Sequence, residues 1–299
     1  MPEQLPTIRT LPTVAVIVPV YHDWDRAARL CHALTKQTLP QHRFTITLVD
    51  NGDTPAPEHH DWPANAVIVS EPAPGSYAAR NRGLASSSGE IVAFTDADCL
   101  PEPDWLANAV RHLVAGDARV AGHVGLTFSG ENPTPAERYE KAFAFEQERY
   151  VARGTCVTAN LVAWRWVFER VGAFDASLLS GGDMEWGVRA RKAGIGIVYR
   201  SDVVVLHPAR RTLRSLLSKR KRTTAGAEAY RRSNGWWAIA RLAARRLLPP
   251  TGQWWKLKTR GDLSPLDRLV AIHVYWLLSV YGSVQLVLLA SGLRSPSRV

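Results

Sequence analysis

Cysteine is scarce in this chain, and no two cysteines form a recognisable motif. The three residues, Cys31, Cys99 and Cys156, lie far apart and form no CxxC pair. This spacing excludes a disulfide framework and a zinc knuckle, and it fits a reducing, cytoplasmic compartment. Residues 1–13 also lack the long apolar run of a signal peptide, so we expect none there.

The signatures of several other protein classes are missing as well. The first apolar run is not followed by GxGxxG, the phosphate-binding loop of a dinucleotide-dependent dehydrogenase. Its last residues and those that follow, Val18–Asp23, do not form the Gly-rich, basic loop expected of a sugar nucleotidyltransferase. Because no helix-turn-helix, zinc-finger or RNP pattern is present, we expect no nucleic-acid partner.

Charge is divided unevenly along the 299 residues. Residues 1–206 hold 19 Lys and Arg against 24 Asp and Glu, whereas residues 207–299 hold 18 against 3. The net charge of +10 therefore comes from the C-terminal third. An acidic front joined to a basic back predicts chemistry in the first part and contact with an anionic surface in the second.

The front of the chain alternates strand and helix patterns. Residues 14–18 are a continuous apolar, mostly β-branched run, as in a strand that is buried on both faces. Further strands are predicted at 44–49, 67–69 and 91–94, and helices at 25–36 and 78–85. Strands separated by segments of helix length predict an α/β fold, with a mostly parallel sheet and helices on both faces.

Polar clusters follow three of these strands, at 19–25, 50–53 and 96–98. Ligands of such sheets bind beyond the carboxyl ends of the strands, so the clusters should meet in one cleft. The last cluster holds Asp96 and Asp98, directly after a buried strand. Two unpaired carboxylates are costly there, and Mg²⁺ or Mn²⁺ bound by carboxylates and substrate phosphates removes that cost. A plain acidic turn is the alternative.

Several linked motifs resemble the family 2 inverting glycosyltransferases of GT-A fold in order and spacing. They are Val18–Tyr21, Leu48–Gly52, Gly75–Leu84, Phe94–Asp98 and a block from Gly154 to Arg191. Linked motifs in order are far more specific than any one of them. The resemblance implies a GT-A-like (Rossmann-like) domain over residues 1–210.

The resemblance also implies a site for a nucleotide-sugar donor. Pro19 and Tyr21 would line the nucleotide pocket, and Asp50 would accept a hydrogen bond from the base. Arg80 would bind the diphosphate or the sugar, since a guanidinium can bind oxygens bidentately. For Arg80, an ion pair with a surface acid is the alternative.

A divalent cation, Mn²⁺ or Mg²⁺, would lie beside that donor. Asp98 would hold the cation, Asp96 would contact the cation or the ribose, and Ala97 would lie against the donor. His207 follows a predicted strand at 203–206, where some members of the family place a metal-binding histidine. A surface residue at a strand end is the alternative for His207.

On the acceptor side, the resemblance makes Asp183 the general base. A carboxylate there can take the proton that the acceptor hydroxyl loses, and attack from that face inverts the anomeric centre. Glu185 is the alternative candidate for the base, and Glu185 and Trp186 would contact the acceptor. The family usually has Glu before this Asp, whereas this chain has Gly182. A helix N-cap is the alternative for Asp183, and core packing is the alternative for Trp186.

Residues 211–299 are predicted to form a basic, helical region that associates with an anionic membrane surface. A helix over 236–248 would carry arginines beside an apolar stripe, as interfacial helices do. Residues 269–293 are uncharged and long enough to span a bilayer. Gly282 would permit a re-entrant hairpin, and a buried core helix is the alternative.

These patterns together predict an inverting, metal-dependent glycosyltransferase at the cytoplasmic face of the cell membrane. Its acceptor would be a glycan or a lipid-linked saccharide of cell-surface polysaccharide synthesis. Two alternatives remain: a membrane-anchored protein that binds nucleotide-sugars or glycans without turnover, and a sugar nucleotidyltransferase.

Overall fold

The computed structural model describes residues 11–54, 56–57, 60–232, 236–291 and 293. Its strands are β1 (Val14–Val20), β2 (Phe44–Asp50), β3 (Ala66–Ser70), β4 (Ile91–Phe94), β5 (Leu100–Pro101), β6 (Arg119–Thr127), β7 (Leu161–Trp164) and β8 (Val198–Pro208). Its helices are α1 (Trp24–Leu34), α2 (Ser76–Ala85), α3 (Trp105–Val114), α4 (Pro135–Phe143), α5 (Gln147–Val151), α6 (Arg165–Val171), α7 (Gly182–Lys192), α8 (Leu213–Arg232), α9 (Trp236–Leu247), α10 (Thr251–Lys258) and α11 (Pro265–Ala290), with 3₁₀ turns η1 (Gln41–Arg43) and η2 (Thr158–Asn160).

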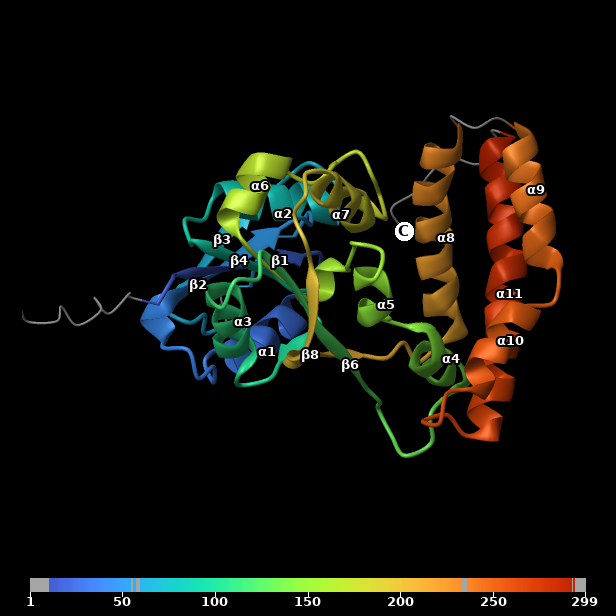
Figure 1. Ribbon diagram of the computed structural model, residues 1–299, viewed down its shortest axis with the longest axis horizontal. Coiled ribbons are helices and arrows are strands. Elements are labelled where there is room, and N and C mark those ends of the chain that lie inside the picture. Colours follow the sequence, from blue (N-terminus) through green and yellow to red (C-terminus); the bar gives the residue numbers. More distant parts are fainter. Residues whose placement is uncertain (1–10, 55, 58–59, 233–235, 292, 294–299) are drawn as a thin grey trace, which may run out of the picture.

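The strands form one eight-stranded sheet in the order β3-β2-β1-β4-β7-β6-β8-β5. β1 to β4 pair in parallel, as predicted from the alternating pattern. β7 then runs antiparallel to both β4 and β6, while β6 and β8 are again parallel. The predicted α/β fold is confirmed (Figure 1). The sheet is mixed around β6 and β7, for which no strands were predicted, whereas the strand predicted at 203–206 is part of β8.

The sheet is buried because its strands carry apolar side chains on both faces. Along β1, Val14, Val16, Val18 and Val20 pack with α1 and α3, whereas Ile17 packs on the opposite face with α2, α6 and α7. This alternation is the period of two of a β-strand. The two apolar clusters hold the carboxyl ends of β1 and β4 side by side, where the polar residues follow.

The C-terminal helices form a separate layer beside the sheet domain. Figure 1 shows α8 between that domain and the pair α9 and α11. Helix α11 packs against α4, α8 and α9 and continues through Gly282 without interruption, so the re-entrant hairpin is not adopted. A Cβ at Gly282 would lie 2.6 Å from Nε of Arg220, so the glycine leaves room for this side chain of α8.

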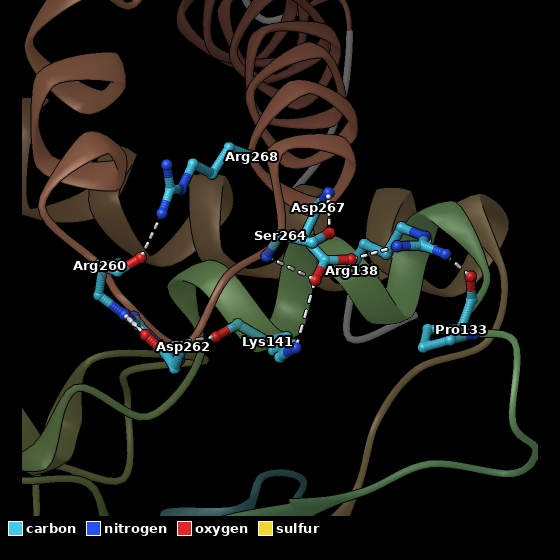
Figure 2. Close-up of polar contacts among 8 residues, drawn as sticks. All are labelled: Pro133, Arg138, Lys141, Arg260, Asp262, Ser264, Asp267 and Arg268. Carbon is cyan, nitrogen blue, oxygen red and sulfur yellow. Dashed lines mark hydrogen bonds and ion pairs between the residues drawn. The ribbon is translucent and has the colours of Figure 1, made fainter.

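Buried acid–base contacts join this layer to α4 (Figure 2). Asp267, in the first turn of α11, forms a capping box with Ser264, whose hydroxyl accepts from the Asp267 backbone N–H at 3.1 Å. The Asp267 carboxylate also pairs with Arg138 and, at 3.3 Å, with Lys141 of α4. Arg260 adds hydrogen bonds to two carbonyl oxygens at the end of α4. The layer is therefore anchored to the sheet domain through charged groups.

Candidate active site

A cavity of about 710 Å³ opens at the carboxyl ends of β1 and β4 and reaches the C-terminal helices. Its walls come from the loops after these strands, from the first turns of α2 and α7, and from α4, α8 and α11. Eight residues predicted from the sequence line it: Pro19, Tyr21, Arg80, Asp96, Ala97, Asp98, Asp183 and His207. The convergence expected of strand-end clusters in a parallel sheet is thus present.

Arg80 is placed by the start of α2. Gly75, with φ of +123°, precedes the helix, and its N–H donates to Oδ1 of Asn51 at 3.1 Å. The Asn51 amide also donates to the carbonyl oxygens of Glu71 and Ala73, which fixes the whole approach to α2. Arg80 lies one turn into the helix, only 4% exposed, and its guanidinium pairs with Asp96. The ion pair is with a site acid rather than a surface acid.

His207 faces Asp98 across the cavity wall. Its Nδ1 lies 2.8 Å from the carbonyl oxygen of Pro208, which can only accept, so Nδ1 carries a proton. In the neutral ring, Nε2 therefore points a lone pair at Oδ2 of Asp98, 3.4 Å away. Burial raises the pKa of Asp98, and the neighbouring His207 lowers it. Two facing acceptors need a proton or a cation between them.

This pair fits a divalent cation as part of its ligand set. Ligands at right angles, about 2.1 Å from one ion, lie roughly 3 Å apart, close to the observed separation. Among the described residues, no group of three or more His, Cys, Asp and Glu side chains could hold a metal. Oxygens of a bound substrate would have to complete the coordination, and phosphates commonly do so.

Asp183 also lines the cavity and lies in the first turn of α7. Its Oδ1 accepts from the Tyr77 hydroxyl at 3.0 Å and from the Met184 N–H at 2.9 Å. Burial raises the pKa of Asp183, while the positive charge of Arg80 and the Tyr77 hydrogen bond lower it. The N-cap of α7 is Gly181, so Asp183 is not the cap. A carboxylate with a raised pKa in a cavity suits proton transfer.

The packing around position 182 explains why this residue is a glycine. A Cβ at this position would lie 2.8 Å from the ring of Tyr77. Any larger residue would push the ring aside and lengthen the hydrogen bond between Tyr77 and Asp183. In this chain, the glycine that replaces the family's usual Glu makes room for a tyrosine that contacts the candidate base.

Three residues predicted for the site do not line the cavity. Trp186 is fully buried, stacks on Phe168 with ring centroids 4.3 Å apart, and donates to the Gly172 carbonyl oxygen at 2.9 Å. It is a core residue and cannot touch an acceptor, so that prediction is corrected. Glu185 forms an ion pair with Arg189 at 2.7 Å. Asp50 stays at the end of β2, where it accepts from the Gly52 N–H at 3.0 Å.

Other residues line the cavity but were not singled out from the sequence. Tyr77 lies inside a motif that the sequence already displays, so its proximity to Arg80 was the available signal. Glu140, Phe145, Arg210 and Lys219 come from α4, from the loop after it and from the C-terminal region. No motif marks them, and only the fold brings them to the site.

Comparison with known proteins agrees with this geometry. Residues 15–170 match the family model "Glycosyl transferase family 2". Glycosyltransferase AglE of Haloferax volcanii is 34% identical over 246 residues, covering 80% of this chain and 78% of that protein. The chain belongs to glycosyl transferase family 2. The family 2 resemblance that the strand-end motifs carry is therefore confirmed, and the protein is a glycosyltransferase.

Two further similarities come from this family 2 enzyme's more distant relatives. The pre-mycofactocin glycosyltransferase of Mycobacterium tuberculosis is 28% identical over 220 residues, which cover 69% of this chain and 45% of that protein. Among solved structures, mannosyltransferase PcManGT from Pyrobaculum calidifontis, in complex with GDP-Man and Mn²⁺, superposes with a TM-score of 0.54. It is 20% identical, and the match covers 96% of this chain and 77% of PcManGT, which shows a GT-A-like fold.

Proposed function

We propose that this glycosyltransferase moves a sugar from a nucleotide-diphosphate sugar to a hydroxyl acceptor, with inversion and with a divalent cation. One observation carries the proposal: the facing pair Asp98 and His207 and the buried carboxylate of Asp183 line the same cavity. The first pair is built to share a cation, and the single carboxylate is built to accept a proton. The family and the GT-A fold support a nucleotide-sugar donor.

The residues divide the reaction between them. As the glycosidic bond to the donor breaks, negative charge grows on the diphosphate. Arg80 lines the cavity beside Asp96, so its guanidinium would contact this diphosphate. Asp183 takes the proton of the acceptor hydroxyl as that oxygen attacks the anomeric carbon from the opposite face. Asp98 and His207 would hold the cation, which would stabilise the departing diphosphate as a Lewis acid.

Two observations support a divalent cation: the ligand set of this chain and the contents of the PcManGT structure. The donor set in this chain is a carboxylate and an imidazole nitrogen with no third protein ligand among the described residues. A substrate diphosphate completes such a set, and the structural relative PcManGT was solved with GDP-Man and Mn²⁺. Mn²⁺ or Mg²⁺ is therefore the cofactor we propose, with Asp96 oriented by Arg80 beside the ribose or the cation.

Association with a membrane is proposed from the outer surface of the C-terminal layer. Helix α11 is long and apolar enough to cross a membrane, although a core helix passes the same test. Its polar Ser279, Ser283 and Gln285 are buried, whereas apolar side chains face outward. In the described part of the layer, the large exposed apolar residues are Leu213, Trp237, Leu247, Leu248, Trp255, Leu266, Leu269, Trp276, Leu277, Val284, Val287 and Leu293. An apolar exterior beside a basic sequence suits an anionic lipid surface.

This apolar surface supports a membrane location for the reaction. We place the enzyme at the cytoplasmic face of the cell membrane, in cell-surface polysaccharide synthesis, with a glycan or lipid-linked saccharide as acceptor. Less than half of the apolar segment of α11 is buried in the protein, and the Ser283 hydroxyl donates to the Ala243 carbonyl oxygen of α9 at 3.2 Å. The layer is therefore suited to lie against the bilayer.

Release of nucleotide diphosphate from a panel of nucleotide-sugars, with Mn²⁺ and with EDTA, tests the proposal. We expect release from one donor only with the cation, loss of release in Asp183→Asn, and an inverted anomeric centre in the product by NMR. Calorimetric binding of a donor without any release would instead support a binding protein without turnover. Formation of the nucleotide-sugar from a sugar-1-phosphate would support a nucleotidyltransferase.

A further inference from the structure

The turn η2 and the residues just before it lie against α7, the helix that carries Asp183. A Cβ at Gly187 of α7 would lie 2.9 Å from the Cα of Thr155, so this glycine lets the helix rest directly on the backbone there. Burial raises the pKa of Asp183, and a hydrogen bond from the Thr158 backbone N–H is one of the contacts that lower it. The first two residues of η2 also line the cavity. This turn therefore both forms part of the cavity wall and supports the candidate base.

A single buried amide holds η2 at both ends. Gln147 begins α5, is 2% exposed and does not line the cavity. Its Oε1 accepts from the Val157 backbone N–H at 2.9 Å. Its Nε2 donates to the carbonyl oxygens of Val157 at 3.4 Å and Asn160 at 3.2 Å, and to that of Gly122 in β6 at 3.3 Å. One side chain thus binds the start and the end of the turn and joins both to the sheet.

The same turn fills an irregularity in the sheet. The register between β6 and β8 shifts at Gly122 and His123. The fully buried Asn160 amide donates there to the carbonyl oxygens of His123 at 2.8 Å and Val203 at 2.9 Å. Its Oδ1 accepts from the Trp105 indole N–H at 2.9 Å. Bulges of this kind redirect the chain beside active sites, and a buried polar network whose members are paired is rigid.

Gln147 acts on the peptide bond that carries the Thr158 N–H. The carbonyl oxygen of Val157 and the N–H of Thr158 belong to one planar, trans peptide unit, so they point in opposite directions. Gln147 binds the carbonyl oxygen of this unit, and the carboxylate of Asp183 accepts from its N–H. The amide on one side of the plane therefore fixes the direction of the donor on the other side.

We propose that Gln147 is a positioning residue for the transfer reaction, because it holds this peptide plane and so aims the Thr158 N–H at Asp183. The proposal rests on the proposed function, in which Asp183 takes the proton of the acceptor hydroxyl. A carboxylate that loses this hydrogen bond is less stable in its charged form, so its pKa rises. Since the base must be deprotonated, the acid limb of the kcat profile then moves to higher pH.

The pH dependence of kcat in the full-length protein tests this, measured as release of nucleotide diphosphate from the accepted donor. Gln147→Leu keeps the approximate side-chain volume and removes the amide. Thr158→Pro removes the N–H itself, at the first position of a turn and after an extended residue, where proline is tolerated. We expect either change to move the acid limb upward by roughly half a pH unit or more and to lower kcat below that limb about threefold. The double variant should show no larger shift, because both changes act through one contact.

Gln37→Leu is the matched control. The Gln37 amide is also buried and also binds two backbone groups, donating to the Glu102 carbonyl oxygen at 2.7 Å and accepting from the Leu106 N–H at 3.0 Å. It joins the chain after α1 to the first turn of α3 and does not line the cavity. We expect Gln37→Leu to lower the melting temperature without moving the acid limb. An equal shift of the limb in this control would overturn the proposal, because general loosening would then explain both.

Comparison with Asp183→Asn separates this proposal from the proposed function. A wild-type kcat in Asp183→Asn would overturn the base itself. Loss of transfer in Asp183→Asn, together with an unmoved acid limb in Gln147→Leu, would overturn the role of Gln147 alone. The Kd for nucleotide diphosphate should not change in Gln147→Leu, and a large rise would assign the residue to donor binding instead. If Gln147→Leu melts below the assay temperature, Gln147→Asn, whose amide is shorter by one methylene group, takes its place with the same expected shift.

Discussion

The Tyr77 hydroxyl donates a hydrogen bond to Oδ1 of Asp183 at 3.0 Å and so joins α2 to the first turn of α7. The same α2 carries Arg80, which pairs with Asp96. The candidate proton acceptor and the candidate diphosphate contact are therefore positioned by one helix. A substitution at Tyr77 should therefore change the rate of proton transfer and leave donor affinity unchanged.

Tyr77→Phe is expected to change the pH dependence of transfer. Asp183 must be deprotonated to accept a proton, and burial already raises its pKa. The Tyr77 hydrogen bond stabilises the charged form and lowers that pKa, so its removal raises the pKa further. Activity falls as the pH drops through this pKa, so the acid limb of the kcat profile should move to higher pH. The Kd for nucleotide diphosphate should stay unchanged.

The companion variant Asp183→Asn removes the proton acceptor itself. We expect kcat to fall roughly 10²- to 10⁴-fold at all pH values, the usual contribution of general base catalysis. Donor affinity, measured by calorimetry, should remain near that of the wild type. Transfer at a wild-type rate in Asp183→Asn would show that another group takes the proton.

Asp98→Ala and His207→Ala are expected to remove metal-dependent donor binding. The two side chains are 3.4 Å apart and would share one cation. In Mn²⁺, the Kd for nucleotide diphosphate should rise roughly a hundredfold in each variant, since a metal clamp stabilises such charge by several kcal/mol. The wild type in EDTA is the internal control and should bind as weakly as the variants. A Kd in Mn²⁺ that stays at the wild-type value in both would remove this pair from the metal site.

Local sequence patterns were sufficient to predict the residues that line the cavity at the ends of β1 and β4. They were insufficient to predict the rest of the cavity lining. The runs that form β1, β2 and β4 are continuous and apolar, so the polar groups after them, including Asp96 and Asp98, could be placed together in advance. The antiparallel β7 pairs with β4 from more than 60 residues away, and no local period encodes such a register. For the same reason, Glu140 and Lys219 became neighbours only in the fold.

The predicted acceptor contacts, Glu185 and Trp186, show a second limit of sequence-based prediction, because helix geometry decides which side chains share a face with Asp183. Glu185 follows Asp183 by two residues, which is about 200° around an α-helix, so the two cannot share one face. Trp186 is closer in angle, but the ring of Phe168 stacks on it within the core. Proximity in the sequence to a candidate base therefore did not imply proximity to the acceptor.

Gly182→Ala tests the packing that links α7 to α2. The new Cβ would lie 2.8 Å from the Tyr77 ring, so the ring must shift and the hydrogen bond to Asp183 must lengthen. We expect kcat and its pH profile to change as they do in Tyr77→Phe. In the double variant, Tyr77→Phe with Gly182→Ala, the two effects should not add, because both act through one contact. Additive losses in kcat would show that Gly182 acts elsewhere.

Glu140→Gln should destabilise the protein at neutral pH. It leaves Arg210 and Lys219 without their buried counter-charge, which costs about 3 kcal/mol. Burial raises the pKa of Glu140, but Lys219 and Arg210 lower it more, so the net direction is down. The stabilisation is therefore present above the unfolded-state pKa and is lost as the pH falls through the folded-state pKa. Urea unfolding of variant and wild type should converge at low pH.

The matched control for that experiment is Glu146→Gln. Glu146 pairs with Arg149 at 2.8 Å on the surface, with the carboxylate side chain 33% exposed. Such pairs contribute about 0–1 kcal/mol, so the control should unfold nearly like the wild type. An equal loss of stability in both variants would show that the buried ion pairs of Glu140 stabilise the protein no more than a surface pair does.

Leu277→Glu is expected to weaken membrane binding without unfolding the protein. Leu277 is 47% exposed on the outer face of α11, so a charge there disturbs the proposed lipid contact but not the core. Co-sedimentation with vesicles of mixed neutral and anionic lipid should show a several-fold loss of bound protein, since burying that side chain is worth about 1 kcal/mol. Val67→Glu is the control, because Val67 is 50% exposed on β3 in the sheet domain. Binding of the wild type should also fall as salt screens the basic residues. Equal vesicle binding by Leu277→Glu and Val67→Glu, with both folded, would show that the outer face of α11 does not meet the lipid.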